Sequence, residues 1–295
     1  MEAVNMKSVN LCPACGKNEF KKKAVINKHN QKSFYSFSKL KYDGLLDSWL
    51  DDIQPEIVDC KACGHHWYIR QPSPDQLANM YNKGMHLLPG LISREPTREM
   101  LAHMQKLAEL SGRDKPQLLD FGSGFGRWAK AAARVGFNVY AYEPSQVRST
   151  KMETEFTLVN DIAQISGMKF DVINLEQVLE HVPTPLETLE HIKCYFSAHS
   201  VLRVRVPNIL RPPEGKRLWH EWPYNGKRVH IMAPFEHLHG FTPGSLQKLA
   251  SRAGFETITG LRLLRHYPFE WLRTCIKPLI PQWGSTFVLL RLPAQ

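Results

Sequence analysis

Three glycines follow an acidic residue at the end of a short apolar run, within the stretch QLLDFGSGFGRW that begins at Gln117. Glycine adopts the positive φ of a tight turn, and its lack of a Cβ lets backbone N–H groups approach a ligand closely. A dinucleotide site favours the spacing GxGxxG, but Arg127 stands where the last glycine would fall, so a pyrophosphate ligand is disfavoured. The residues of this candidate nucleotide-binding turn are Asp120, Gly122, Ser123, Gly124 and Gly126.

A second acid, Glu143, ends the next apolar run, Phe137–Tyr142. It lies 23 residues after Asp120, close to the interval of about 20 residues expected when one helix separates two strands. A carboxylate can accept hydrogen bonds from both hydroxyls of a ribose. The alternative is that both acids are solvated strand ends.

Two CxxCG motifs, CPACG at Cys12 and Cys15 and CKACG at Cys60 and Cys63, have the spacing of metal ligands. Two thiolates in one tight turn can bind the same ion, and four complete a tetrahedral shell without an open position. We therefore expect a structural Zn²⁺ that stabilises a small ribbon. A disulfide pair or an iron cluster is the alternative.

The 44 residues between the two motifs exceed what a minimal ribbon needs. We expect the segment Lys21–Asp59 to add strands and a short helix around Leu45–Leu50. His65 and His66 follow the last cysteine of the second motif closely. They are expected on the ribbon surface, because the thiolates already complete the metal shell.

The glycine turn and the two acids resemble the class I S-adenosylmethionine (SAM) dependent methyltransferases. The resemblance implies that Asp120 and the glycine turn wrap the methionine part of SAM and that Glu143 binds the ribose hydroxyls. It also places Asp161, after a short strand near Leu158, where the adenine amino group is bound; a cap or turn role is the alternative. The implied fold class is α/β, a Rossmann-like methyltransferase sheet, mostly parallel with an antiparallel last strand, preceded by the zinc ribbon.

The fourth strand, Phe170–Leu175, continues into EQVLEHVPTP, which closely resembles the segment that lines the methyl-transfer site in small-molecule methyltransferases of this class. Glu176 and Gln177 stand at the strand end, where open α/β sheets bind ligands, and are expected to contact the cofactor. His181 is a candidate base, because a neutral imidazole accepts protons near neutral pH; a helix cap is the alternative. The lack of an NPPY-like motif argues against methylation of adenine.

A later stretch, EHLHGFTPGSLQKLASRAGF, begins at Glu236 and resembles a large group of bacterial methyltransferases that also start with two CxxCG motifs. Members of that group often act on sugars or on other envelope and secondary-metabolite precursors. The resemblance implies that Glu236 and His237 join His181 as candidate catalytic residues. Thr242 is expected to cap the following helix, which ends at Gly254.

Apolar spacing and turn residues predict six further elements. They are a helix over Pro96–Leu110, a helix from Ser145 to about Phe156, a helix over Thr184–Ser197, and strands over Val201–Val206, Phe255–Leu264 and Ser285–Leu292. The apolar excursion Tyr267–Trp283 is too short to cross a bilayer. Cys194 and Cys275 lack partners at metal spacing and are expected to be buried thiols.

The expected domains are a zinc ribbon over residues 1–72, a helical linker over 73–115 and a methyltransferase domain over 116–295, in which residues 209–234 form a substrate lid. The net charge is +10, and from Ser200 onward 14 Lys and Arg stand against 5 Asp and Glu. This surplus favours a partner that carries phosphate or carboxylate, with a solvated surface as the alternative. With no apolar run of 18 residues and no apolar leader, we expect a cytoplasmic protein without a transmembrane segment.

These features predict SAM-dependent methyl transfer to a small, anionic acceptor such as a nucleotide-linked sugar, a glycan or a secondary-metabolite precursor. An RNA methyltransferase would share the basic surplus and the ribbon, and would bind nucleic acid with a steep salt dependence. A noncatalytic scaffold that binds SAM or its product is a further alternative, whereas the glycine spacing disfavours a nicotinamide dehydrogenase. The sequence leaves open the acceptor atom and the oligomeric state.

Overall fold

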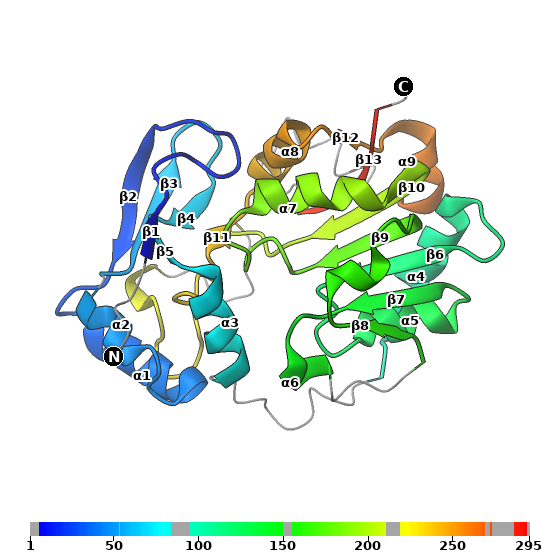
Figure 1. Cartoon of the computed structure of the whole chain (residues 1–295). Coiled ribbons are helices and arrows are strands. Elements are labelled where there is room, and N and C mark those ends of the chain that lie inside the picture. Colours follow the sequence, from blue (N-terminus) through cyan, green and yellow to red (C-terminus); the bar gives the residue numbers. More distant parts are fainter. Residues whose placement is uncertain are drawn as a thin grey trace. The chain divides into compact units, whose positions relative to one another are not determined.

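The computed structural model of the chain describes residues 6–52, 54–83, 95–149, 155–210, 219–268, 272 and 286–293. The chain forms two compact units, each assembled from separate stretches of sequence (Figure 1). Unit 1 comprises Met1–His86, Leu179–Leu186 and Pro207–Arg252, and unit 2 comprises Leu87–Val178, Glu187–Val206 and Ala253–Gln295. The domain division expected at residues 72 and 115 follows chain order and stays a prediction.

Unit 2 is built on a seven-stranded sheet with the strand order β12-β13-β10-β9-β6-β7-β8. Its strands are β6 (Gln117–Phe121), β7 (Asn138–Tyr142), β8 (Thr157–Val159), β9 (Phe170–Glu176), β10 (Phe196–Arg205), β12 (Glu256–Thr257) and β13 (Phe287–Arg291). Strands β6 to β10 pair in parallel, whereas β13 is antiparallel to both β10 and β12. This confirms the expected Rossmann-like methyltransferase sheet with an antiparallel last strand.

Helices α4 (Arg98–Ser111), α5 (Arg127–Arg134) and α9 (Gly260–His266) gather around one hydrophobic cluster of unit 2 (Figure 1). Further helices connect the strands, namely α6 (Gln146–Ser149), η1 (Ile162–Ile165), α7 (Pro185–Ile192) and η2 (Lys193–Tyr195). On α4, apolar residues recur at helical spacing and are buried against the cluster. These residues are Met100, Met104, Leu107 and Leu110.

Strand β10 begins at Phe196, so the expectation of a helix reaching Ser197 and a strand starting at Val201 is wrong there. The Ser197 N–H donates to Ser200 Oγ at 2.7 Å, and Ser200 Oγ donates to the Phe170 carbonyl at 2.5 Å. These side-chain contacts hold the chain extended before its register with β9 becomes regular at Val201.

The strand expected over Phe255–Leu264 is also wrong in its second half, because only Glu256 and Thr257 pair with β13 and the chain then forms α9. Leu263 and Tyr267 lie four residues apart, and both are buried in the core of unit 2, which is the spacing of a helix. The apolar residues of the two-residue strand β12 and of the buried face of α9 were therefore predicted as a single strand.

Two further expectations concern segments that the structure describes only in part. The excursion Tyr267–Trp283 lies largely outside the described residues, as does Cys275, and the helix expected from Ser145 is described as far as Ser149. Cys194 is exposed, so its expected burial is wrong. It lies on η2, where Tyr195 is the buried residue.

Unit 1 contains a four-stranded antiparallel sheet with the order β11-β4-β3-β2. Its strands are β2 (Phe20–Val25), β3 (Glu56–Cys60), β4 (His66–Tyr68) and β11 (His239–Gly240), and a separate pair is formed by β1 (Met6–Ser8) and β5 (Arg70–Pro72). Its helices are α1 (Gln31–Tyr42), α2 (Asp47–Asp52), α3 (Pro74–Lys83), η3 (Trp219–Glu221) and α8 (Pro243–Arg252). The strands and short helix expected within Lys21–Asp59 correspond to β2, β3 and α2. The sequence analysis misses α1, whose buried side chains Phe34, Phe37 and Tyr42 are aromatic residues of modest helix propensity.

The described part of the expected substrate lid packs into the hydrophobic cluster of unit 1. Trp222 is 1% exposed, and its Nε1 donates to the Met232 carbonyl at 2.7 Å. The Tyr68 hydroxyl donates to the same carbonyl at 2.9 Å. Residues 211–218 lie outside the described residues, and the lid role of residues 209–234 stays a prediction.

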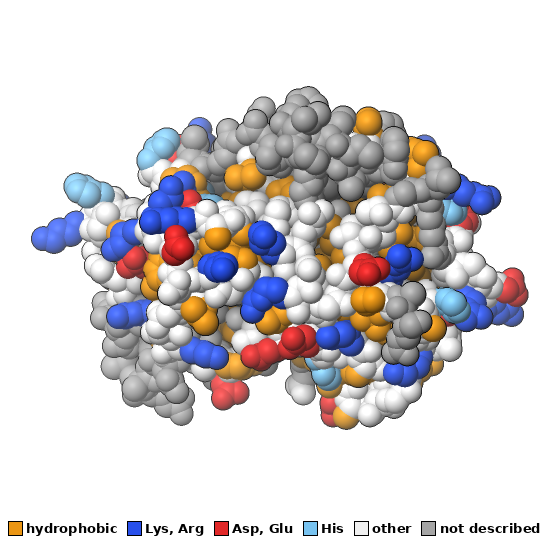
Figure 2. Space-filling view, turned by 90° about the horizontal axis from the view of Figure 1, so that it is seen from above, with side chains coloured by type: hydrophobic (Ala, Val, Ile, Leu, Met, Phe, Trp, Pro, Cys, Tyr) orange, Lys and Arg blue, Asp and Glu red, His pale blue; other side chains and the backbone are white. Residues whose placement is uncertain are grey.

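No helix within the described ranges is long and apolar enough to cross a membrane. On the face shown in Figure 2, the described Lys and Arg side chains are scattered among acidic, hydrophobic and uncharged ones. On that face the basic surplus therefore does not gather into one continuous patch.

Thr242 caps α8 as expected, and this cap can be tested by substitution. Its Oγ1 accepts from the Ser245 N–H at 3.0 Å and donates to the Cys63 carbonyl at 3.1 Å. Thr242→Val keeps the shape and removes both hydrogen bonds, so urea denaturation should report a loss of about 1–2 kcal/mol in the free energy of unfolding. Thr259→Val is the matched control, because Thr259 precedes α9 without a side-chain cap bond. Equal losses in both variants would contradict the assignment.

Candidate functional site

The glycine turn after β6 folds back onto the end of the neighbouring strand β7. The N–H groups of Gly122 and Ser123 both donate to the Tyr142 carbonyl at 2.9 Å. The Gly124 N–H donates to Glu143 Oε2, also at 2.9 Å. The two predicted features, the turn and the second acid, are therefore joined by a direct hydrogen bond.

Backbone conformation requires glycine in this turn. Gly122, Gly124 and Gly126 have φ values of 76°, 61° and 73°, in the left-handed region that side chains disfavour. At Gly122 space is limiting as well, because a Cβ there would lie 2.9 Å from Val178 Cγ2. Any larger residue at Gly122 would strain the backbone and push the chain off the end of β9.

Glu143 is buried, which excludes the solvated strand end as the description of this acid. Its Oε1 accepts from the Ser145 N–H at 3.0 Å, while its Oε2 accepts from Gly124. Burial raises the pKa of Glu143, and the nearby charge of Arg148 and the two backbone N–H groups oppose that rise. The carboxylate is thus held in one orientation at the end of β7.

Asp120 belongs to a chain of buried polar groups that crosses three strands. Its Oδ1 accepts from Asn174 Nδ2 at 2.7 Å, and Asn174 Oδ1 accepts from Arg203 Nη1 at 2.6 Å. The same Arg203 Nη1 lies 2.7 Å from Glu176 Oε2. Arg203 is 0% exposed, and its guanidinium lies 4.3 Å from the ring centroid of Trp128.

Burial raises the pKa of Asp120 to about 7, although the hydrogen bond from Asn174 and the charge of Arg203 lower it. Asp120 Oδ2 is buried and has no hydrogen-bond partner within the described part of the chain. A water molecule or a ligand is what normally satisfies such an oxygen. Asn174 and Arg203 were missed at the sequence level, where the available signal was a polar residue in the middle of each of the largely apolar runs FDVINL and VLRVRV.

A cavity of about 380 Å³ lies at the carboxyl ends of the parallel strands of unit 2. Its lining residues are Thr97, Glu99, Met100, Ser123, Phe125, Arg127, Trp128, Glu176, Gln177 and Arg205. Three of the predicted residues, Ser123, Glu176 and Gln177, therefore lie around one cavity. A larger cavity of about 580 Å³ is at the other end of β10 and holds none of the predicted site residues.

Asp161 is exposed and caps η1. Its Oδ1 accepts from the Ala163 N–H at 2.9 Å, and Gln164 completes a capping box. The cap alternative thus describes its contacts, while a role in adenine binding stays a prediction.

The two predicted histidines meet within unit 1. The ring centroids of His181 and His237 are 4.5 Å apart, with an interplanar angle of 89°. His181 Nδ1 lies 2.7 Å from the Glu236 carbonyl, and His237 Nδ1 lies 2.7 Å from the Ile231 carbonyl. Because a carbonyl only accepts, these bonds assign the proton to Nδ1 in both rings. Each Nε2 then carries the lone pair that can accept a proton.

Glu180 lies beside the two histidines. It is 1% exposed, and its Oε1 lies 4.0 Å from His181 Nε2. An imidazolium formed at His181 would be stabilised by this carboxylate. Glu180, His181 and His237 also each offer one ligand atom within 4.8 Å of the others.

Two tyrosines complete this cluster and were not predicted. The Tyr81 hydroxyl of α3 lies 3.0 Å from His181 Nδ1, and the Tyr42 hydroxyl at the end of α1 donates to Glu236 Oε2 at 3.1 Å. Both lie more than 100 positions from Glu236 in sequence, and no local pattern marks them. Only the folded chain brings them to the histidines.

The four predicted cysteines come together in unit 1, and their Sγ atoms all lie within 4.8 Å of one another. The Sγ atoms of Cys12 and Cys63 are 3.6 Å apart, as are those of Cys15 and Cys60. A tetrahedral zinc site with Zn–S bonds of about 2.3 Å has sulfur–sulfur edges of about 3.8 Å. The hydrogen bond between Cys12 and Cys63 lowers the pKa of Cys12 to about 6 and raises the pKa of Cys63, so these two thiols share a proton. The cluster therefore fits a tetrahedral metal ion.

The expectation that His65 and His66 lie on the ribbon surface is wrong, because both are buried. His66 is the first residue of β4, an inner strand between β3 and β11, and His65 directly precedes it. His65 Nε2 lies 3.3 Å from His239 Nδ1 on the β11 side, and the ring of His66 stacks on Trp219 with centroids 5.5 Å apart. Burial lowers the pKa of His65 well below its usual value.

Comparison with known families gives one match. The family described as "Methyltransferase domain" matches residues 93–259, which is more than half of the chain. Among curated proteins, none matches the chain.

Several solved structures are similar to the chain at low identity. The plantazolicin methyltransferase BamL, in complex with a substrate analogue and S-adenosylhomocysteine (SAH), has 11% identity and a TM-score of 0.45 over 65% of this chain and 81% of BamL. The mitomycin 7-O-methyltransferase MmcR has 14% identity and a TM-score of 0.45 over 66% of this chain and 54% of MmcR. The Burkholderia thailandensis 1,6-didemethyltoxoflavin-N1-methyltransferase, with bound SAH, has 18% identity and a TM-score of 0.39 over 65% and 75%. The match to MmcR thus spans less than two thirds of that protein.

Metal content tests the cysteine cluster. We expect about one zinc ion per purified chain. Cys60→Ser should remove the ion and lower the midpoint of thermal unfolding by about 5–10 °C, because metal binding contributes to folding. Cys194→Ser is the matched control, since Cys194 is exposed and lies outside the cluster. A metal-free protein whose unfolding midpoint is unchanged by Cys60→Ser would contradict the assignment.

Proposed function

The chain belongs to the methyltransferase-domain family and is a SAM-dependent methyltransferase, and from this premise we propose the roles of its residues. The proposal covers the residues that bind the cofactor, the residues that act on the methyl acceptor, and the chemical class of that acceptor. SAM supplies a methyl group that its sulfonium makes electrophilic. The tasks of the protein are then to hold the cofactor, to orient the acceptor and to accept the proton that the acceptor loses.

Glu143 carries the cofactor proposal. It is buried at the end of β7 and fixed by the N–H groups of Gly124 and Ser145. A carboxylate has more lone pairs than those two bonds use, so it can also accept from the two hydroxyls of a ribose. We assign it to the ribose, and we assign Asp161 to the adenine amino group.

The cavity at the strand ends suits the amino-acid end of the cofactor, which carries one ammonium and one carboxylate. Its walls present charges of both signs, because Glu99 and Glu176 line it together with Arg127 and Arg205. The Arg205 Nη1 atom lies 3.9 Å from Glu176 Oε1, so the opposite charges are neighbours. The remaining residues proposed for the methionine part are Asp120, Gly122, Ser123, Gly124, Gly126 and Gln177.

His181 is the base that the contacts favour. Its Nδ1 is engaged by the Glu236 carbonyl, so its Nε2 is the accepting atom, and Glu180 stabilises the charge that results. His237 has the same tautomer, and it is the second candidate. Glu236 follows as a third, with Tyr42 donating to its carboxylate.

The acceptor we propose is a small anionic molecule, such as a nucleotide-linked sugar, a glycan or a secondary-metabolite precursor. The basic surplus of the C-terminal third supports the anionic character. We further propose that the ion held by the four cysteines is a structural Zn²⁺, because a complete thiolate shell leaves no position for substrate.

Calorimetric titration with SAH tests the cofactor residues. The wild-type protein should bind SAH and not NADH. Glu143→Gln removes the charge and one acceptor oxygen, so the dissociation constant for SAH should rise about 10- to 100-fold. Glu187→Gln, an exposed glutamate on α7, is the control and should bind like wild type. NADH binding, or unchanged SAH binding by Glu143→Gln, would contradict the proposal.

Turnover with radiolabelled SAM and a panel of nucleotide-linked sugars and glycans tests the base. His181→Ala should lower kcat by about 10²- to 10⁴-fold, with SAH affinity unchanged, because only the proton transfer is lost. His199→Ala, an exposed histidine at the start of β10, is the control. If His181→Ala and His237→Ala both keep full turnover, the base assignment is wrong.

A further inference from the structure

We propose that Glu95 is a positioning residue for the cofactor cavity, because it fastens the start of α4 to helix α5. The inference rests on the proposed function, since that cavity is the one assigned to the amino-acid end of SAM. No pattern in the sequence marks Glu95, which lies outside every motif described above.

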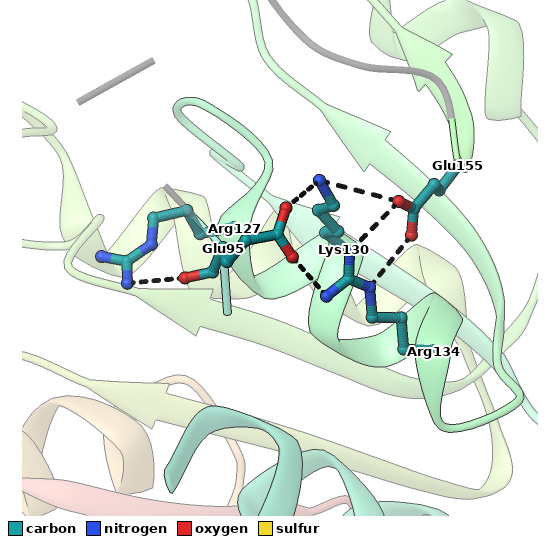
Figure 3. A network of polar contacts seen from close by, with 5 residues as sticks. All are labelled: Glu95, Arg127, Lys130, Arg134 and Glu155. Atoms are coloured by element: carbon teal, nitrogen blue, oxygen red, sulfur yellow. Dashed lines mark hydrogen bonds and ion pairs between the residues drawn. The ribbon is translucent and has the colours of Figure 1, made fainter. Parts of the chain in front are cut away.

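Three side chains on successive turns of α5 contact Glu95 (Figure 3). Lys130 Nζ lies 2.7 Å from Glu95 Oε1, and Arg134 forms an ion pair with Glu95 Oε2. Arg127 Nη2 donates to the backbone carbonyl of Glu95 at 3.2 Å. Both the side chain and the backbone of Glu95 are therefore held by the same helix.

Glu155 contacts two of the same cations from another part of the chain (Figure 3). It lies 3.6 Å from Lys130 Nζ and 3.4 Å from Arg134 Nε. The Lys130 side chain is only 11% exposed, so solvent screens its pairs less than those of a fully exposed lysine. Glu95 and Glu155 thus share their cationic partners but differ in what they are attached to.

Glu95 is attached to a wall of the cavity. Two residues later, Thr97 Oγ1 accepts from the Met100 N–H at 3.2 Å and caps α4. Thr97, Glu99 and Met100 line the cavity, as does Arg127 at the start of α5. The contacts of Glu95 therefore join the α4 wall to the α5 wall.

Exposed ion pairs contribute little to the stability of a fold, so loss of Glu95 should leave thermal unfolding nearly unchanged. The effect should appear in ligand affinity instead, because ordering a loosened wall opposes binding. SAH is a suitable probe because it is the proposed ligand of the cavity, and its own charged contacts there are the same in the wild type and in Glu95→Gln. A difference in the salt dependence of SAH affinity between these two proteins then reports the ion pairs of Glu95.

The test is calorimetric titration with SAH at low and high ionic strength for three proteins. At low ionic strength, Glu95→Gln should weaken SAH binding about three- to tenfold, the scale of two exposed ion pairs. Glu155→Gln, the matched control with the same partners, should stay within about twofold of wild type. High salt should weaken the wild type toward the affinity of Glu95→Gln and change Glu95→Gln much less.

Each outcome decides between the proposals. A wild-type protein that binds no SAH overturns the proposed cofactor site and this inference together. A wild type that binds SAH, with Glu95→Gln equal to it, overturns this inference alone, as do equal losses in Glu95→Gln and Glu155→Gln. If Glu95→Gln unfolds at a markedly lower temperature, the SAH affinity of the wild type at low and high ionic strength tests the role of Glu95 instead. A wild-type affinity that does not change with salt refutes that role.

Discussion

Charge buried at the carboxyl ends of β6, β7 and β9 is the constraint on which unit 2 depends. Asp120 and Glu143 are almost fully removed from water, which is costly unless other groups compensate. Arg203 and Asn174 compensate on the β6 and β9 side, and the Gly124 N–H compensates at Glu143. A sheet built for stability alone would place apolar side chains here. Instead, buried polar and charged side chains stand at these strand ends.

In unit 1, the ribbon that carries the four cysteines and the histidine cluster form one framework. The segment that follows His237 becomes β11, the last strand of the ribbon sheet. The next helix, α8, is tied to both cysteine turns, because Thr242 donates to the Cys63 carbonyl and Arg252 donates to the Pro13 carbonyl at 3.0 Å. The cysteine cluster thereby fixes the backbone that carries Glu236 and His237.

Sequence reasoning succeeded where the signal was local. The glycine turn needs positive φ, and the cysteine spacing needs one tight turn, so neighbouring residues suffice to recognise both. It failed where distant segments decide the outcome. The burial of His65 depends on β11, more than 170 residues later, and Tyr42 meets Glu236 only through the fold. Arg203 escaped notice because an arginine in a short apolar run looks like an exposed position until its partners are known.

The position of SAH in a crystal of its complex with this protein tests the central claim most directly. The account predicts both ribose hydroxyls on the carboxylate of Glu143 and the homocysteine end in the cavity beside Glu176 and Arg205. A ribose bound away from Glu143, or a homocysteine end outside that cavity, would contradict the view that the buried strand-end charges exist to hold the cofactor.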